Sequence, residues 1–213
     1  MTHRIKKEHI KKSVLFELAI ILGLLISMFI SYSSQLESTC DDIRNSVLRL
    51  HVIANSDSTK DQALKLKVRD AMLETGTTLF SGSVDVTTAK SVAKSEIDTL
   101  EKAAECVLRE NGCNDNVHIE IGKSRFPTKT YGNITLPAGK YEAVRVIIGK
   151  GEGHNWWCVM FPPMCLPAAE GETELEDVLT QDGIDLVSSN PKYEIKFKIV
   201  EWYEWAKSKL VGE

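Results

Sequence analysis

The hydrophobic pattern of the chain begins with one long apolar run near the N-terminus. Residues 14–30 read VLFELAIILGLLISMFI, with Glu17 as the only charge, and five basic residues occur in the twelve positions before Ser13. A run of seventeen residues is near the lower limit for crossing a bilayer, and a basic flank favours the cytoplasmic side. The pattern predicts a signal peptide or membrane anchor over residues 1–33, with the body of the chain outside the cytoplasm. The small-x-small sequence at 31–33 would permit cleavage, so cleaved and uncleaved forms both stay open.

After a predicted polar stalk over residues 34–46, residues 47–167 alternate between strand-like and helix-like patterns. Runs of β-branched and apolar residues predict strands, and apolar positions recurring every three or four residues predict helices. The expected strands are 47–54, 117–121, 141–148 and 157–161, and the expected helices run from Ser58 to about Leu79 and from Thr87 or Thr88 to Glu110. Residues 136–139 and 149–153 look like turns between antiparallel neighbours. The fold class predicted is α+β, with helices packed on one mixed sheet.

The last quarter of the chain changes character twice. Seven acidic residues and no Lys or Arg occur from Glu170 to Asp185, which predicts an acidic, solvated linker over 168–191. Residues 192–213 then carry apolar positions at helical spacing among lysines, which predicts an amphipathic C-terminal helix. Such a helix can lie on a membrane, enter a partner's groove, or pack back onto the domain, and the pattern does not choose among them.

Composition narrows the classes of function. The 213 residues are 43% hydrophobic and 26% charged, which suits one globular domain with appendages, and the net charge of -4 argues against nucleic acid as a partner. The five cysteines form no CxxC pair, and the spacing of His154, Cys158 and Cys165 lacks the close pairs of a tetrahedral zinc site. We therefore expect no metal and no cofactor.

The most unusual stretch is GHNWWCVMFPPMC at residues 153–165. One interpretation is an envelope cysteine hydrolase in which His154 activates the Cys158 thiol, although no third, orienting group is evident. The stronger interpretation is a rigid docking surface, closed by a disulfide between Cys158 and Cys165 around the proline pair.

The three large aromatic residues of this stretch divide between two faces if it is a strand. Strict alternation places Trp157, Val159 and Phe161 on one face and Trp156 on the other. We expect Trp157 in the core and Trp156 as an exposed anchor.

The sequence Asn55-Ser56-Asp57 stands between an expected strand and an expected helix. Backbone N–H groups at such a place can hold an anion, but the stretch lacks the glycines of a phosphate-binding loop. A turn and helix cap is the favoured interpretation.

Three blocks of the chain resemble the stage II sporulation protein R family of spore-forming bacteria. They are LRLHVIANSDSTKDQALKLKVRDAML at 48–73, FPTKTYGNITLPAGKYEAVRVIIGKGEGHNWWCVMFPPMC at 126–165, and KFKIVEWYEW at 196–205. The resemblance implies a signalling protein exported from the forespore into the space between the forespore and mother-cell membranes. There it would activate a membrane-embedded aspartic protease that processes the precursor of an early mother-cell sigma factor.

On this resemblance the chain is an activating ligand and not an enzyme, and the sequence has neither an aspartic protease motif nor HExxH. The alternatives are the cysteine hydrolase and a membrane-associated structural protein. The residues that we expect to contact the receptor are Trp156, Trp157, Phe161, Asn55 and Asp57.

Overall fold

The computed structural model describes residues 2–132, 134–164 and 178–188. The chain divides into two compact units, Met1–Thr39 and Cys40–Glu213. The first unit consists of helix α1 (Thr2–Ser46), whose last turns belong to the second unit. By length and composition, its stretch Val14–Ser46 can cross a membrane, with a mean hydropathy of 2.5 in its most apolar part. The predicted N-terminal apolar helix is therefore present.

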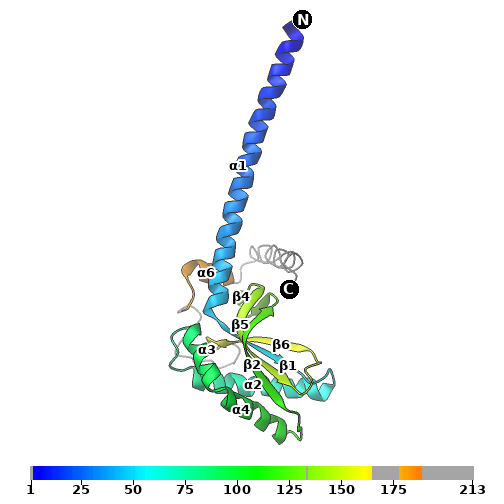
Figure 1. The fold of residues 1–213 in the computed structure, drawn as a ribbon, viewed down its shortest axis with the longest axis vertical. Helices are drawn as coiled ribbons and strands as arrows, with labels where there is room; N and C mark the ends of the chain where they lie inside the picture. Colours follow the sequence, from blue (N-terminus) through cyan, green and yellow to red (C-terminus); the bar gives the residue numbers. More distant parts are fainter. Residues whose placement is uncertain (1, 133, 165–177, 189–213) are drawn as a thin grey trace. The chain divides into compact units, whose positions relative to one another are not determined.

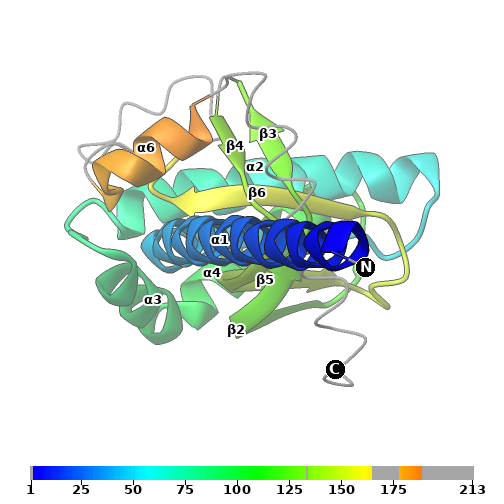
Figure 2. The same cartoon turned by 90° about the horizontal axis from the view of Figure 1, so that it is seen from above.

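The second unit is built on a mixed four-stranded sheet in the order β2-β5-β1-β6 (Figure 1). β1 pairs in parallel with β5 and antiparallel with β6, and β2 pairs antiparallel with β5. β2 and β6 lie at opposite sides of the sheet in the view from above (Figure 2). The strands are β1 (Leu48–Ile53), β2 (Val117–Phe126), β5 (Gly139–Ile148) and β6 (Asn155–Phe161); a separate ribbon contains β3 (Lys129–Tyr131) and β4 (Ile134–Leu136). The predicted mixed sheet is confirmed.

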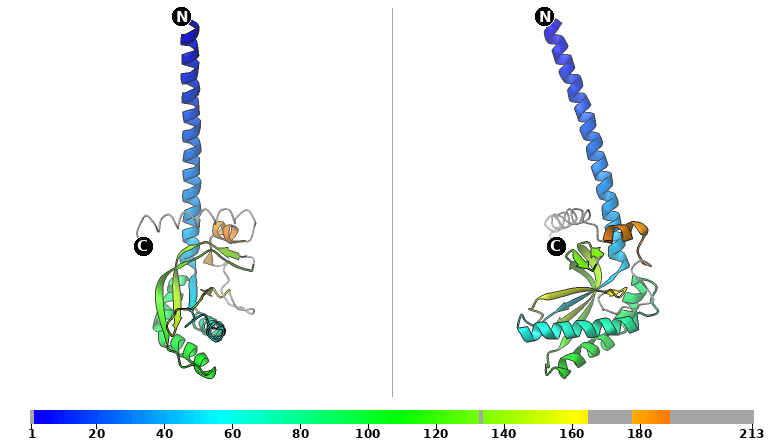
Figure 3. Two further views of the ribbon diagram at one scale, coloured as in Figure 1. Left: turned by 90° about the vertical axis from the view of Figure 1, so that its right-hand side faces the viewer. Right: turned by 180° about the vertical axis from the view of Figure 1, so that it is seen from behind.

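Helices α2 (Thr59–Leu79), α3 (Val86–Ser95) and α4 (Ile97–Glu110) enclose the hydrophobic core against one face of this sheet. Figure 3 shows α2 and α4, in cyan and green, side by side below the strands. α2 begins where the Oγ of Ser58 accepts a hydrogen bond from the Asp61 backbone N–H at 3.1 Å, which satisfies one of the free donors of its first turn. Alternate residues of the strands, such as Leu50 and Val144, complete the core from the side of the sheet.

The structure differs from the sequence-based prediction in three helical regions. The single helix expected to end at Glu110 is two helices, because the backbone of Glu96 leaves the helical conformation (φ −107°, ψ 21°). The stalk expected over 34–46 is helical, and its Cys40 and Ile43 are fully buried. Within the expected acidic linker, α6 (Gln181–Val187) forms and buries two apolar side chains, so that its described part is not a solvated linker. The predicted C-terminal helix over 192–213 lies outside the described residues.

The connection from β5 to β6 crosses the end of β1. The sequence predicted residues 149–153 as a turn between antiparallel neighbours, but β1 lies between β5 and β6. Because β1 and β5 are parallel, both end at the same edge of the sheet, and β6 starts from that edge. The loop 149–154 therefore passes directly over the turn that follows β1.

Candidate functional site

The turn after β1 and the loop after β5 are joined by a network of hydrogen bonds. The Oδ1 of Asn55 accepts from the backbone N–H of Lys150 at 3.0 Å, and its Nδ2 donates to Asp61 Oδ2 at 3.1 Å. Ser56 Oγ donates to the same Asp61 oxygen at 2.6 Å, and these bonds hold the pKa of Asp61 below its ordinary value. The side-chain amide of Asn55 thus has hydrogen-bond partners inside the protein. Its structural role is to hold the 149–154 loop against the turn after β1.

Asp57 and His154 form the outer part of the same network. Asp57 Oδ1 accepts from the backbone N–H of His154 at 2.7 Å and is in direct contact with His154 Nδ1. The side chains are 54% and 77% exposed, respectively, and the hydrogen bond from the His154 side chain is the main reason why the pKa of Asp57 is lowered. Asp57 and His154 are therefore accessible to a partner, whereas Asn55, Ser56 and Asp61 are half-buried.

Lys65 of α2 supports the loop from the helix side. Lys65 is only 4% exposed, and its Nζ donates to the carbonyl of His154 at 2.9 Å and to Gln62 Oε1 at 2.6 Å. Burial lowers the pKa of this ammonium. The network therefore fixes the backbone immediately before β6.

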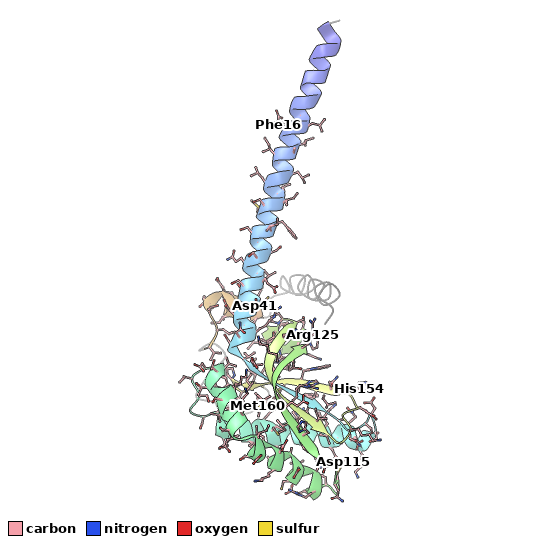
Figure 4. All side chains as sticks on the ribbon, in the orientation of Figure 1. Phe16, Asp41, Asp115, Arg125, His154 and Met160 are labelled. Carbon is pink, nitrogen blue, oxygen red and sulfur yellow. The ribbon has the colours of Figure 1, made fainter. Side chains whose placement is uncertain are left out.

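Figure 4 shows where this network lies: its member His154 is at one end of the sheet, whereas Met160 lies closer to the middle of the sheet.

The structure reverses the expected positions of the two tryptophans on β6. Trp156 pairs with Val52 and packs against the core cluster on the helix side. Its Nε1 is buried and has no hydrogen-bond partner among the described residues, and the guanidinium of Arg69 lies 4.5 Å from its ring centroid. Trp156 is thus a half-buried packing residue, and the prediction of an exposed anchor is wrong.

Trp157 lies on the opposite face of the sheet. Its ring stacks on His51 at 5.9 Å with an interplanar angle of 17°, and Lys129 Nζ lies 5.1 Å from its centroid. Trp157 remains half-buried and does not belong to the core cluster.

Phe161 belongs to the core. It is 1% exposed, and its ring meets Phe80 edge-on at 6.3 Å. The pairing register shifts by one residue between Arg49↔Val159 and Leu48↔Phe161. A bulge of this kind ends strict alternation, which is why Phe161 does not share a face with Trp157. Its burial leaves no surface for a partner.

Arg49 is a feature that sequence reasoning missed. It is fully buried; its Nε donates to the carbonyl of Cys158 and its Nη2 to Tyr131 Oη, both at 2.8 Å. Tyr131 in turn donates to the carbonyl of Trp157 at 3.0 Å. The guanidinium also lies 4.3 Å from the ring centroid of Phe126, on the same side of the sheet. The signal in the sequence that could have revealed it is a single arginine within an otherwise apolar predicted strand.

The proposed nucleophile pair does not form. Cys158 is fully buried and disulfide-bonded, so it has no free thiol, whereas His154 contacts Asp57. Cys40, Cys106 and Cys113 are not disulfide-bonded. Cys165, the expected partner of Cys158, lies outside the described residues, so that pairing stays a prediction. No group of three His, Cys, Asp or Glu suited to a metal occurs in the described part of the chain.

These features define a class of protein: an α+β domain preceded by an apolar N-terminal helix, with polar and aromatic surfaces at the loop end of its sheet. The family model of stage II sporulation protein R matches residues 44–170. Stage II sporulation protein R of Bacillus subtilis (strain 168) is 35% identical over 181 residues, which cover 75% of this chain and 81% of the relative. The chain belongs to the stage II sporulation protein R family, and its role is in sporulation. No solved structure matches the chain.

Proposed function

We propose that this protein is an exported signal that activates a membrane-embedded aspartic protease, which then processes the precursor of an early mother-cell sigma factor. The observation that carries the proposal is the family match over 44–170, in a chain that begins with a potential membrane-crossing helix. Export from the forespore would place the folded unit between the forespore and mother-cell membranes, where it can meet a receptor in the mother-cell membrane.

An activating ligand works by binding the active state of its receptor more tightly than the inactive state. Moving a receptor from 1% to 99% active requires a preference of about 10⁴-fold. A surface that is already ordered loses less entropy on binding and so retains more of its interaction energy. The loop 149–154, fastened by Asn55, Asp57 and Lys65, is an ordered surface of this kind.

The cysteine hydrolase is the less favoured function. A nucleophilic cysteine must be an accessible thiolate beside a base. Cys158 is buried, disulfide-bonded and directed toward the core. A Cys158→Ser variant that folds and still signals under reducing conditions would eliminate this alternative.

Reconstitution of the receptor protease in lipid vesicles tests the proposal. The full chain is added on the extracytoplasmic side, and cleavage of the sigma factor precursor is followed with time. We expect cleavage to depend on both the added protein and the catalytic aspartates of the protease. A protease variant lacking one of these aspartates is the control. Equal cleavage with and without the added protein would refute the proposal.

Deleting residues 192–213 separates the signal from a structural protein of the membrane. If the truncated chain activates the protease as well as the full chain does, this predicted amphipathic segment is not the functional element. Loss of membrane association together with unchanged activation would exclude the structural alternative.

A further inference from the structure

We infer that the receptor is recognised by the face of the sheet opposite α2, α3 and α4, around Trp157, and that this face accepts a segment of the receptor carrying a carboxylate beside an apolar side chain. The inference rests on the proposed function, because it assumes a protein receptor. We call this surface the Trp157 patch; it comprises Trp157, His51, Lys129, Asn155 and Arg145.

The patch lies on the side of the sheet that α2, α3 and α4 do not enclose. Neighbouring residues of a strand point to opposite faces, and Leu50 and Val52 of β1 belong to the core cluster whereas His51 does not. His51 pairs across the sheet with Arg145 on one side and with Trp157 on the other. Three adjacent strands thus contribute one side chain each to the same row.

Ring stacking and hydrogen bonds hold the side chains of this row in place. His51 Nε2 is 2.9 Å from Asn155 Oδ1, and the His51 ring stacks on Trp157. The carbonyl of Trp157 accepts from Tyr131, whose hydroxyl also accepts from the buried Arg49. An indole with fixed orientation provides a large apolar contact at low entropic cost, which is typical of binding hot spots.

The charges around the patch indicate the chemistry of the segment that it binds. Arg145 Nη1 is paired with Glu120 Oε2 at 2.6 Å, but neither Lys129 nor Arg49 has a carboxylate partner among the described residues. Arg49 is fully buried, so it cannot reach a partner, whereas Lys129 is half-buried beside the Trp157 ring. In a protein with a net charge of -4, this ammonium is a local excess of positive charge. A carboxylate on the receptor would complement this excess. An apolar neighbour of that carboxylate would pack against the indole.

The test uses the full chain in the reconstituted cleavage assay, and it measures the concentration that gives half-maximal activation. We expect Trp157→Ala to raise this concentration about 30-fold, the equivalent of ~2 kcal/mol at a hot spot. Lys129→Glu should raise it about tenfold, and Lys129→Arg should leave it unchanged, because only the charge is required. Activation by the wild type should weaken with added salt more steeply than activation by Lys129→Glu.

Matched controls separate recognition from folding and from lipid binding. Lys102→Glu reverses an exposed lysine on α4, outside the patch, and should activate like the wild type; thermal melts show that each variant is folded. Folded Trp157→Ala and Lys129→Glu proteins that activate like the wild type would overturn the inference. A defect of Lys129→Glu confined to vesicles with anionic lipid would also overturn it, because the cation would then serve the membrane. If the wild type itself fails to stimulate cleavage, the proposed function fails.

Discussion

Two adjacent tryptophans of the same strand have different roles, because neighbouring positions face different layers. Trp156 packs on the core cluster beneath Arg69. Trp156→Ala should therefore lower the free energy of unfolding by about 2–3 kcal/mol, somewhat less than the ~3–5 kcal/mol typical of large aromatic core residues. Denaturant unfolding of the full chain in detergent measures the change. Trp157→Ala is the matched control, and its loss should be smaller. A wild-type unfolding midpoint for Trp156→Ala would contradict this assignment.

His51 makes stability depend on pH. Burial lowers the pKa of its imidazole below the ordinary value of 6.5; the hydrogen bond with Asn155 opposes this shift, and the charge of Arg145 adds to it. The unfolded chain therefore binds this proton more readily than the folded chain. The contribution of His51 to stability is present in full above pH 6.5, and it is lost as the pH falls from 6.5 toward the lower pKa of the folded state.

His51→Gln should remove this part of the pH dependence, which amounts to at most ~1.4 kcal/mol per pH unit for one proton. Unfolding curves between pH 5 and pH 7.5, a range set around the ordinary pKa of about 6.5, measure the slope. His118→Gln is the control, because the His118 side chain is 68% exposed and its removal should leave the slope in place. An unchanged slope in the His51 variant would show that other groups cause it.

At the scale of elements, the crossing of the 149–154 loop over the turn after β1 depends on a glycine. A Cβ at Gly153 would lie 2.7 Å from the carbonyl carbon of Ser56 and 2.8 Å from Ala54 Cβ. Backbone would have to move, so Gly153→Ala should destabilise the protein by about 1–3 kcal/mol. The same substitution at Gly82, which has nothing within 4 Å of its Cβ position, should change stability by less than ~0.5 kcal/mol. Equal unfolding midpoints for the two variants would refute the close approach.

The sequence predicted the elements better than their connections. Local patterns located the four strands of the main sheet and α2, but not β3 and β4. Burial leaves a periodic signal at positions such as Leu64 and Val68, and the cap at Ser58 marks the start of α2. They did not reveal that β1 inserts between β5 and β6, because strand order depends on contacts between distant residues. The bulge before Phe161 also left no local signal, and it invalidated the assignment of faces that rested on alternation.

The candidate site was predicted in part. The Asn55-Ser56-Asp57 turn was recognised as a helix-entry motif, but its attachment to Lys150 and His154 follows only from the crossing loop. Arg49 and His51 were visible as polar residues in an apolar strand. Their significance depends on Trp157 and Tyr131, which come from other strands.

On the scale of the whole molecule, the two compact units suit different surroundings. The large apolar side chains from Val14 to Tyr32 in the first unit are exposed, from 47% at Val14 to 71% at Met28, whereas the second unit has an enclosed core. Exposed apolar surface along a helix is stable in lipid and unfavourable in water. An anchored form would confine the folded unit to the membrane surface and so raise its effective concentration toward a membrane receptor.

The orientation of the chain in the membrane gives the last prediction. The N-terminal flank carries Arg4 and four lysines before Ser13, and such a flank is retained in the cytoplasm. A reporter enzyme fused after Glu213 that is active only outside the cytoplasm should therefore be active. Replacing the five basic residues with glutamine should reduce its activity, because the orienting charge is gone. A cytoplasmic reporter at the same position serves as the reciprocal control and should be inactive. Activity of the cytoplasmic reporter instead would place the Trp157 patch on the wrong side of the membrane for a receptor outside the cytoplasm, and the proposed signalling function would fail with it.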